Sequence, residues 1–336
     1  MTDAPLNVVI TGGAGFIGAR LASEILARGS LSVAGGPSRL VSRLTLLDQV
    51  APPVLLSQDP RVAVWQGDLV SGLEDDAVSP LAEADLVFHL AAAVSADCER
   101  DFDLGMRANV TGSQLVLGAC RRSGRTPVVV FSSSLAVFGG TGSHPLPDVV
   151  TDSTLPVPQN SYGVQKFVGE QLIADYSRKG FIRGRSVRLM TVTVRPGRPN
   201  GAASGFLSGI IREPLAGLRA NSPVPPGTAV AVSSPARAVE GLLRAAEAAP
   251  DLWGDATAVN LPSVTVTVGE MVQTLERVAG PAVSALVSWE PDEVIAGIVR
   301  GWPARFSTTR AAALGLRPDN GFAAIVRSYI RDTAGR

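Results

Sequence analysis

Two side chains four residues apart in the segment SYGVQK (161–166) have the chemistry to move a proton. A helix beginning at Asn160 or Ser161 would place Tyr162 and Lys166 on one face, because four residues make just over one turn. A tyrosine hydroxyl has an unperturbed pKa of about 10, too high for a good base at neutral pH. A nearby ammonium stabilises the phenolate, so the spacing predicts a pair in which Lys166 lowers the pKa of Tyr162.

A run of three serines lies upstream of this pair, at the end of the apolar segment VVVFSSS (128–134). We interpret the segment as a buried strand, and a serine at its end could hydrogen-bond and orient a reacting oxygen. Tyrosine and lysine four residues apart also occur by chance on solvated helices. The upstream serines favour the catalytic interpretation.

The segment TGGAGFIG (11–18) follows the apolar run 6–11, and helical spacing of apolar residues continues from Phe16 to Arg28, where Gly29 ends it. In this setting Gly12 allows a tight turn, Gly15 lets a pyrophosphate approach, and Gly18 lets helix and strand pack closely. An ordinary glycine turn is the weaker alternative. The loop therefore predicts a dinucleotide site with the phosphates at the helix N-terminus.

The segment LTLLD (44–48) ends in Asp48, which we expect to bind the adenosine ribose hydroxyls. It lies further from the loop than the usual ~20 residues, because residues 30–39 look like an inserted hairpin or loop. A carboxylate there repels a 2′-phosphate and favours NAD over NADP, although Arg39 and Arg43 could weaken that preference. Asp68 is placed to bond the adenine amine or, equally, to cap a helix.

Further segments show a resemblance that covers nearly the whole chain: HLAA (89–92), RANVTG (107–112), SSSLAVFG (132–139) and VRPG (194–197). Together with the motifs above, they resemble the extended short-chain dehydrogenase/reductases. The resemblance implies that Ser134 is the catalytic serine, with Ser132 and Ser133 structural, and that Asn109 supports the catalytic Tyr162 and Lys166. It also implies an NAD site made of Gly12, Gly15, Phe16, Ile17, Gly18, Asp48, Asp68, Leu69, Leu90, Ala91, Ala92, Asn109, Tyr162, Lys166 and Pro196.

Five other segments, 101–105, 195–206, 210–217, 233–239 and 267–272, resemble one branch of that family. Enzymes of this branch oxidise the C2 hydroxyl of a four-carbon sugar acid with NAD, and the expected reaction converts D-erythronate to 2-dehydro-D-erythronate. Ser134 and Tyr162 would hold the reacting hydroxyl, and Ser95 and Asn200 are weaker candidates for the other hydroxyls.

A sugar acid carries a carboxylate, which an arginine fork binds well. Arg212 and Arg237 are the candidates for this contact, and each is as well explained by an ion pair. For Arg195 we expect a structural role.

The main alternative is a nucleotide-sugar epimerase with tightly bound NAD, which would use the same catalytic residues. A dehydratase is disfavoured because Leu135 and Ala136 stand where that class has an Asp-Glu pair. A non-catalytic NAD-binding protein is disfavoured because such proteins usually lose the tyrosine or the lysine.

Composition narrows the possible classes of protein further. The chain has 336 residues, 46% of them hydrophobic and 18% charged, which indicates a globular protein with a large core. A formal net charge of zero does not indicate a protein that binds nucleic acid. No apolar run reaches the ~20 residues that span a bilayer. Two cysteines and two histidines predict neither a disulfide framework nor a metal centre. We expect a cytoplasmic enzyme.

Strands alternate with helices through about residue 195, which predicts an α/β fold: a Rossmann-type, doubly wound parallel sheet. We expect an NAD-binding domain over 1–196 and a smaller, mostly helical substrate lobe over 197–336, with some strands of the lobe rejoining the main sheet. In the lobe, Thr267 and Glu270 predict a capping box for a helix to Val278, and Pro291 suits a first helical position. The resemblance implies a homodimer that pairs the helices near 105–123 and 160–179 as a four-helix bundle.

Overall fold

A computed structural model describes residues 4–74, 79–197 and 202–334 of the protein. Its main sheet has eight strands: β1 (Leu6–Thr11), β2 (Ser30–Ser32), β3 (Ser38–Asp48), β4 (Val62–Gln66), β5 (Leu86–His89), β6 (Val128–Ser134), β7 (Arg183–Leu189) and β11 (Val259–Asn260). Across the sheet the order is β11-β7-β6-β5-β1-β3, and β3 pairs with both β2 and β4. All pairs are parallel except β2–β3. This is the Rossmann-type sheet that the sequence predicts, and the insertion at 30–39 forms the β2–β3 hairpin.

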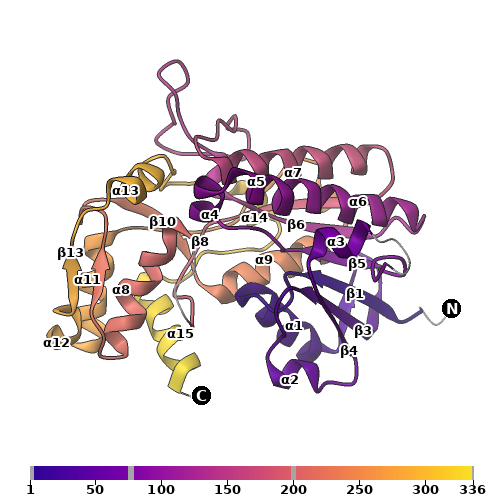
Figure 1. Ribbon diagram of the computed structural model, residues 1–336, viewed down its shortest axis with the longest axis horizontal. Coiled ribbons are helices and arrows are strands. Elements are labelled where there is room, and N and C mark those ends of the chain that lie inside the picture. Colours follow the sequence, from indigo (N-terminus) through magenta and orange to yellow (C-terminus); the bar gives the residue numbers. More distant parts are fainter. Residues whose placement is uncertain (1–3, 75–78, 198–201, 335–336) are drawn as a thin grey trace.

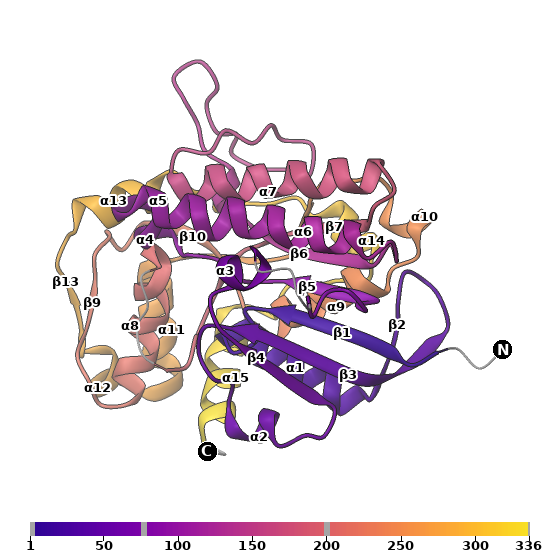
Figure 2. The same ribbon diagram turned by 45° about the vertical axis from the view of Figure 1, so that its right-hand side comes forward.

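Alternate residues of the central strands enter different hydrophobic clusters, because successive side chains point to opposite faces. Val8 and Ile10 of β1 pack in one cluster, and Val9 packs in the other. The first face is covered by α1 (Phe16–Arg28) and α9 (Pro235–Glu247), and the second by α6 (Gly112–Arg122) and α7 (Ser161–Arg178). Figures 1 and 2 show α6 and α7 side by side, with the sheet between them and α1.

The C-terminal part of the chain builds a second body beside the sheet (Figure 1). It contains a three-stranded sheet of β8 (Thr191–Val192), β10 (Ala229–Ser233) and β12 (Val264–Thr267), and a pair of β9 (Ala220–Ser222) with β13 (Val287–Trp289). Its helices include α8 (Phe206–Leu215), α11 (Val268–Ala279), α13 (Glu293–Arg300) and α15 (Phe322–Ala334), which share a separate hydrophobic cluster. However, β11 pairs with β7 and α9 packs on the first face of the main sheet, so the chain crosses between the two bodies more than once.

Local capping explains where several helices begin and end. Gly29 has φ +67° and ends α1, and the Asn160 side chain accepts a hydrogen bond from Gly163 N at the start of α7. The Thr267–Glu270 capping box is present. The prediction for Pro291 was wrong, because Asp292 caps α13 by accepting bonds from Val294 N and Ile295 N, which leaves the proline outside the helix.

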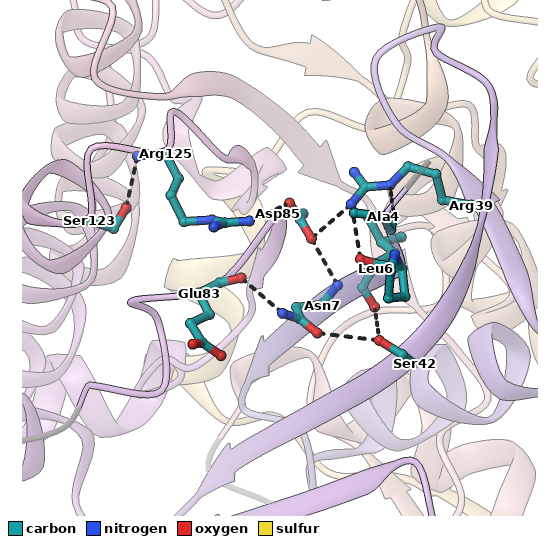
Figure 3. A network of polar contacts seen from close by, with 10 residues as sticks. Ala4, Leu6, Asn7, Arg39, Ser42, Glu83, Asp85, Ser123 and Arg125 are labelled. Atoms are coloured by element: carbon teal, nitrogen blue, oxygen red, sulfur yellow. Dashed lines mark hydrogen bonds and ion pairs between the residues drawn. The ribbon is translucent and has the colours of Figure 1, made fainter. Parts of the chain in front are cut away.

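A polar network ties together the amino-terminal ends of the central strands (Figure 3). Asp85, which precedes β5, accepts hydrogen bonds from Asn7 N at 3.0 Å, Arg39 Nη2 at 3.2 Å and Arg125 Nη2 at 3.1 Å. Arg39 also donates to Ala4 O at 2.7 Å. Arg39 is thereby held at the end of β3 opposite Asp48, away from the expected ribose site.

Candidate active site

Two neighbouring cavities lie at the carboxyl ends of β1, β5 and β6, where a doubly wound sheet binds its ligands. The catalytic cavity encloses about 270 Å³ and contains Ser134, Tyr162 and Lys166 in its wall. The adenosine cavity encloses about 420 Å³ and contains Asp48 and Asp68. The two share the wall residues Gly12, Gly15, Leu90 and Ala92.

The glycine loop between the cavities has the geometry that its sequence predicts. Gly12 has φ +71°, and a Cβ there would lie 2.8 Å from Ala91 N. A Cβ on Gly18 would lie 2.1 Å from Gly12 O, so only glycine lets α1 pack this closely on the loop. A Cβ on Gly15 would meet only Gly12 O, at 3.2 Å, and would otherwise project into space that both cavities border. The loop therefore fits a dinucleotide pyrophosphate at the start of α1.

Asp48 lies at the end of β3 and faces the glycine loop. Its Oδ2 accepts hydrogen bonds from Ala14 N at 3.0 Å and Gly15 N at 3.2 Å, and its Oδ1 accepts from Val50 N at 3.3 Å. The carboxylate thus orders the loop as well as bordering the adenosine cavity.

Asp68 lies where both of its expected roles are possible, beside the adenosine cavity and at the start of a helix. It borders the adenosine cavity, and its Oδ1 accepts from Ser71 N at 2.9 Å in the first turn of α3 (Leu69–Glu74). Arg107 donates to both carboxylate oxygens, at 3.0 and 2.6 Å. Hydrogen bonds from Arg107 and Ser71 hold the pKa of Asp68 well below its usual range, so the group is ionised at neutral pH.

The catalytic cavity brings together the three residues expected to move the proton. Lys166 is only 3% exposed, donates to Ser132 O at 2.8 Å and lies 5.7 Å from the centroid of the Tyr162 ring. Ser134 Oγ accepts from Ala136 N at 3.1 Å and hydrogen-bonds Tyr162. Ser133 instead donates to Glu170 Oε1 at 2.5 Å, beneath the cavity. Ser134 is therefore the serine of the run that is placed to act with Tyr162.

Burial dominates the ionisation of this group. It raises the pKa of Tyr162 to about 12, while Arg195 and the bond from Ser134 oppose that rise. Burial also lowers the pKa of Lys166 to about 8, and the charge of Glu170 opposes that fall. The predicted lowering of the Tyr162 pKa by Lys166 therefore does not outweigh burial, and the chain by itself keeps Tyr162 neutral at neutral pH.

Small residues let α7 approach the end of β6. A Cβ on Gly163 would lie 2.1 Å from Ala136 O, and a Cβ on Gly169 would lie 2.5 Å from the Phe131 ring. These glycines place Tyr162 and Lys166 of α7 against the serine-bearing end of the strand.

Asn109 is 3% exposed and forms part of neither cavity wall. Its Oδ1 accepts from Ala93 N at 2.8 Å, and its Nδ2 donates to Ala93 O at 3.2 Å and Gln165 Oε1 at 2.8 Å. It thus joins the segment after β5 to α7. Asn109 lies in a π-helical stretch, Met106–Thr111, an irregularity common at functional sites.

A buried polar chain continues from Asn109 to the glycine loop. Ser113 Oγ donates to Asn109 O at 2.6 Å and lies 3.0 Å from His89 Nε2, and His89 Nδ1 lies 2.7 Å from Thr11 Oγ1. Because the Ser113 proton goes to Asn109 O, His89 Nε2 is the donor toward Ser113. Burial lowers the pKa of His89 to about 3, so the ring is neutral and serves as a structural link.

Only some of the residues expected to hold substrate lie at the catalytic cavity. Ser95 borders the catalytic cavity, and its Oγ accepts from Ala203 N at 3.0 Å. Arg212 and Arg237 are absent from the cavity wall and form ion pairs with Glu213 at 2.5 Å and Glu240 at 2.6 Å. Pro196 borders a different cavity, and Asn200 lies outside the described residues.

Sequence reasoning did not assign several residues of the catalytic cavity wall to the site, among them Met190, Arg195, Ser204 and Trp302. Trp302 follows α13, far along the chain, and packs with Leu135 and Met190. Its sequence neighbours carry no motif, so only the tertiary fold reveals its place. Arg195, in contrast, directly precedes Pro196, and that proximity to a family motif was a usable signal.

The chain belongs to the NAD dependent epimerase/dehydratase family, whose model matches residues 8–230. The resemblance to the extended short-chain dehydrogenase/reductases is thereby confirmed, and the chain is an NAD-dependent dehydrogenase. It is 49% identical to D-erythronate dehydrogenase of Cupriavidus necator, over 97% of this chain and 98% of the relative. It is 40% identical to D-erythronate dehydrogenase of Haemophilus influenzae, over 97% and 99%. A crystal structure of a nucleoside-diphosphate-sugar epimerase from Agrobacterium tumefaciens matches with a TM-score of 0.87 and 37% identity, covering 98% of this chain and 95% of that one.

The helices of the described residues are each too short or too polar to span a membrane. The same residues contain no group of three or more His, Cys, Asp or Glu side chains that could hold a metal ion.

Proposed function

We propose that the protein oxidises the C2 hydroxyl of D-erythronate with NAD, giving 2-dehydro-D-erythronate. The observation that carries this proposal is the convergence of Ser134, Tyr162 and Lys166 on one cavity that continues past the glycine loop. The two relatives named D-erythronate dehydrogenase support the choice of substrate.

The size of the catalytic cavity also favours a small substrate. Its volume of about 270 Å³ is below the ~300–1,000 Å³ typical of pockets for drug-sized ligands. Such a space favours a four-carbon acid over a substrate that also carries a nucleoside diphosphate. The structural match to an epimerase keeps that activity as the second candidate.

In the proposed mechanism Ser134 and Tyr162 hydrogen-bond the C2 hydroxyl. The Tyr162 phenolate then takes the proton of that hydroxyl. Bound NAD would supply the acceptor for the hydride that leaves C2. Lys166, anchored on Ser132 O, stabilises the phenolate, contributes to holding the nicotinamide ribose and passes the proton outward. Asn109 positions α7 through Gln165.

The test is NADH formation with a panel of four-carbon sugar acids, D-erythronate first. The proposal requires turnover that depends on NAD and on the C2 configuration. Inactivity on every free acid, with NAD retained through purification, would instead support the epimerase.

We further propose a cytoplasmic homodimer that pairs α6 and α7 with their copies. Five apolar side chains at least 36% exposed lie on α5 (Phe102–Gly105), the π-helical stretch and α7, and they support this face as the interface: Phe102, Leu104, Met106, Val164 and Val168. Light scattering should give twice the molar mass of one chain for the wild-type protein. The double variant Val164→Asp and Val168→Asp should give the mass of a single chain. A monomeric wild-type protein would contradict the proposed dimer.

A further inference from the structure

The charged side chains in the wall of the catalytic cavity are all positive. Among the described residues of that wall, Lys166 and Arg195 are the cations, and no aspartate or glutamate is present. Lys166 already donates a hydrogen bond to Ser132 O and lies beside Tyr162. Arg195 is therefore the cation left to attract an anionic substrate into the cavity.

Arg195 is held rigidly by protein atoms on several sides. Its Nε donates to Val192 O at 2.9 Å, and one Nη donates to Ser204 Oγ at 2.8 Å. Its backbone N donates to Ser208 Oγ at 3.0 Å, and its carbonyl accepts from Arg212 at 2.8 Å. A side chain fixed in this way loses little conformational entropy when it binds a ligand.

The charge of Arg195 is not neutralised by a neighbouring acid. None of the ion pairs formed within residues 4–74, 79–197 and 202–334 includes it. By contrast, Arg212 and Arg237 are each paired with a glutamate and lie outside the cavity wall. Arg195 is partly buried, and a cation withdrawn from water in this way is stabilised when a ligand supplies a carboxylate.

Arg195 also lies close to the reacting centre. Its positive charge lowers the pKa of Tyr162, and burial lowers its own pKa, against the opposing effect of Tyr162. In a 2-hydroxy acid the carboxyl carbon is bonded directly to the carbon that is oxidised. A group that binds the carboxylate must therefore lie near Tyr162, and Arg195 meets that condition.

We propose that Arg195 binds the substrate carboxylate in the catalytic cavity, beside the hydroxyl that Ser134 and Tyr162 hold. This inference rests on the proposed function, and it assigns the enzyme to short 2-hydroxy acids in preference to neutral polyols. It replaces the structural role expected for Arg195 and the carboxylate contact expected of Arg212 or Arg237.

The test compares wild-type protein with Arg195→Met and Arg195→Lys, using D-erythronate and erythritol, in which a hydroxymethyl group replaces the carboxylate. Losing one partner of a buried charge pair typically costs about 30- to 5,000-fold in affinity. Arg195→Met should raise KM for D-erythronate by that factor, change kcat much less and erase the preference for the acid over erythritol. Arg195→Lys should restore part of the loss. Arg178→Met, on an exposed ion pair at the far end of α7, is the matched control and should leave both constants unchanged.

A second readout separates this inference from the proposed function. Quenching of NADH fluorescence measures D-erythronate binding to the NADH complex without turnover. Wild-type protein that binds the acid but does not oxidise it, with binding lost in Arg195→Met, would contradict the reaction and uphold the carboxylate site. An unchanged KM, or an equal fall in kcat for both substrates, would overturn the role of Arg195.

Discussion

Lys166 Nζ lies 5.7 Å from the centroid of the Tyr162 ring and is fixed there by a 2.8 Å hydrogen bond to Ser132 O. The strand that ends in Ser134 thus also anchors Lys166 beside Tyr162. We expect Tyr162→Phe to abolish turnover while leaving NADH binding intact, since the phenol is lost and the packing of the ring is kept. Stopped-flow turnover together with NADH fluorescence titration would measure both, and normal turnover in this variant would remove Tyr162 from the base role.

The raised pKa of Tyr162 predicts its behaviour in the unliganded protein. Burial disfavours the charged phenolate, so the pKa rises to about 12, and only about 1% of Tyr162 is ionised at pH 10, the ordinary tyrosine pKa. The ultraviolet difference between wild type and Tyr162→Phe should therefore show no tyrosinate below that pH. Adding NAD should move the transition to lower pH. A transition near pH 10 without NAD would show that burial does not control this group.

Asp48 should control the choice between NAD and NADP. We expect Asp48→Ala combined with Gln49→Arg to lower the preference for NAD by about 10- to 100-fold, the range of one or two charge-assisted hydrogen bonds. Because Asp48 also accepts from Ala14 N and Gly15 N, Asp48→Asn is the control that keeps the side-chain shape. An unchanged ratio of kcat/KM for the two cofactors would assign Asp48 to the loop alone.

Asn109 should act as a positioning residue through Gln165 and the segment after β5. Asn109→Ala removes the contacts with Ala93 and Gln165, and we expect kcat to fall about 10- to 100-fold with little change in KM for NAD. Asn109→Asp keeps the acceptor toward Ala93 N and should retain more activity. Equal activity in all three proteins would mean that α7 is fixed without this bridge.

The Glu170–Arg188 pair should carry stability beneath the site. Its side chains are 3% and 5% exposed, and Glu170 also accepts from Ser133. Glu170→Ala would leave Arg188 buried without its partner, at a cost of about 3–5 kcal/mol in the free energy of unfolding. The exposed Asp175–Arg178 pair is the comparison, where Asp175→Ala should cost less than about 1 kcal/mol. Urea unfolding of both variants measures the difference, and equal losses would contradict it.

Local sequence signals predicted the parts of the structure that local physics determines. The glycine loop, the end of α1 at Gly29 and the start of α7 at Ser161 each depend on a few adjacent residues. The π-helical stretch around Asn109 was not predicted, and the side-chain contacts of Asn109 there are with Ala93 and Gln165, which are distant in sequence.

The substrate side of the site was the part that sequence could not assign. Arg195, Arg212 and Arg237 look alike in a sequence, and only their partners separate them: two face glutamates, and Arg195 faces the catalytic cavity. Trp302 reaches the same cavity by tertiary packing. The two glutamates lie one and three residues after their arginines and are visible in the sequence, whereas only the fold shows that Arg195 faces the cavity.

Hydride transfer from C2 is tested with D-erythronate deuterated at C2. We expect the deuterium to appear in the reduced nicotinamide and turnover to show a primary isotope effect. Unlabelled NADH, with the deuterium retained in the product, would place the oxidation at another carbon and contradict the proposed reaction.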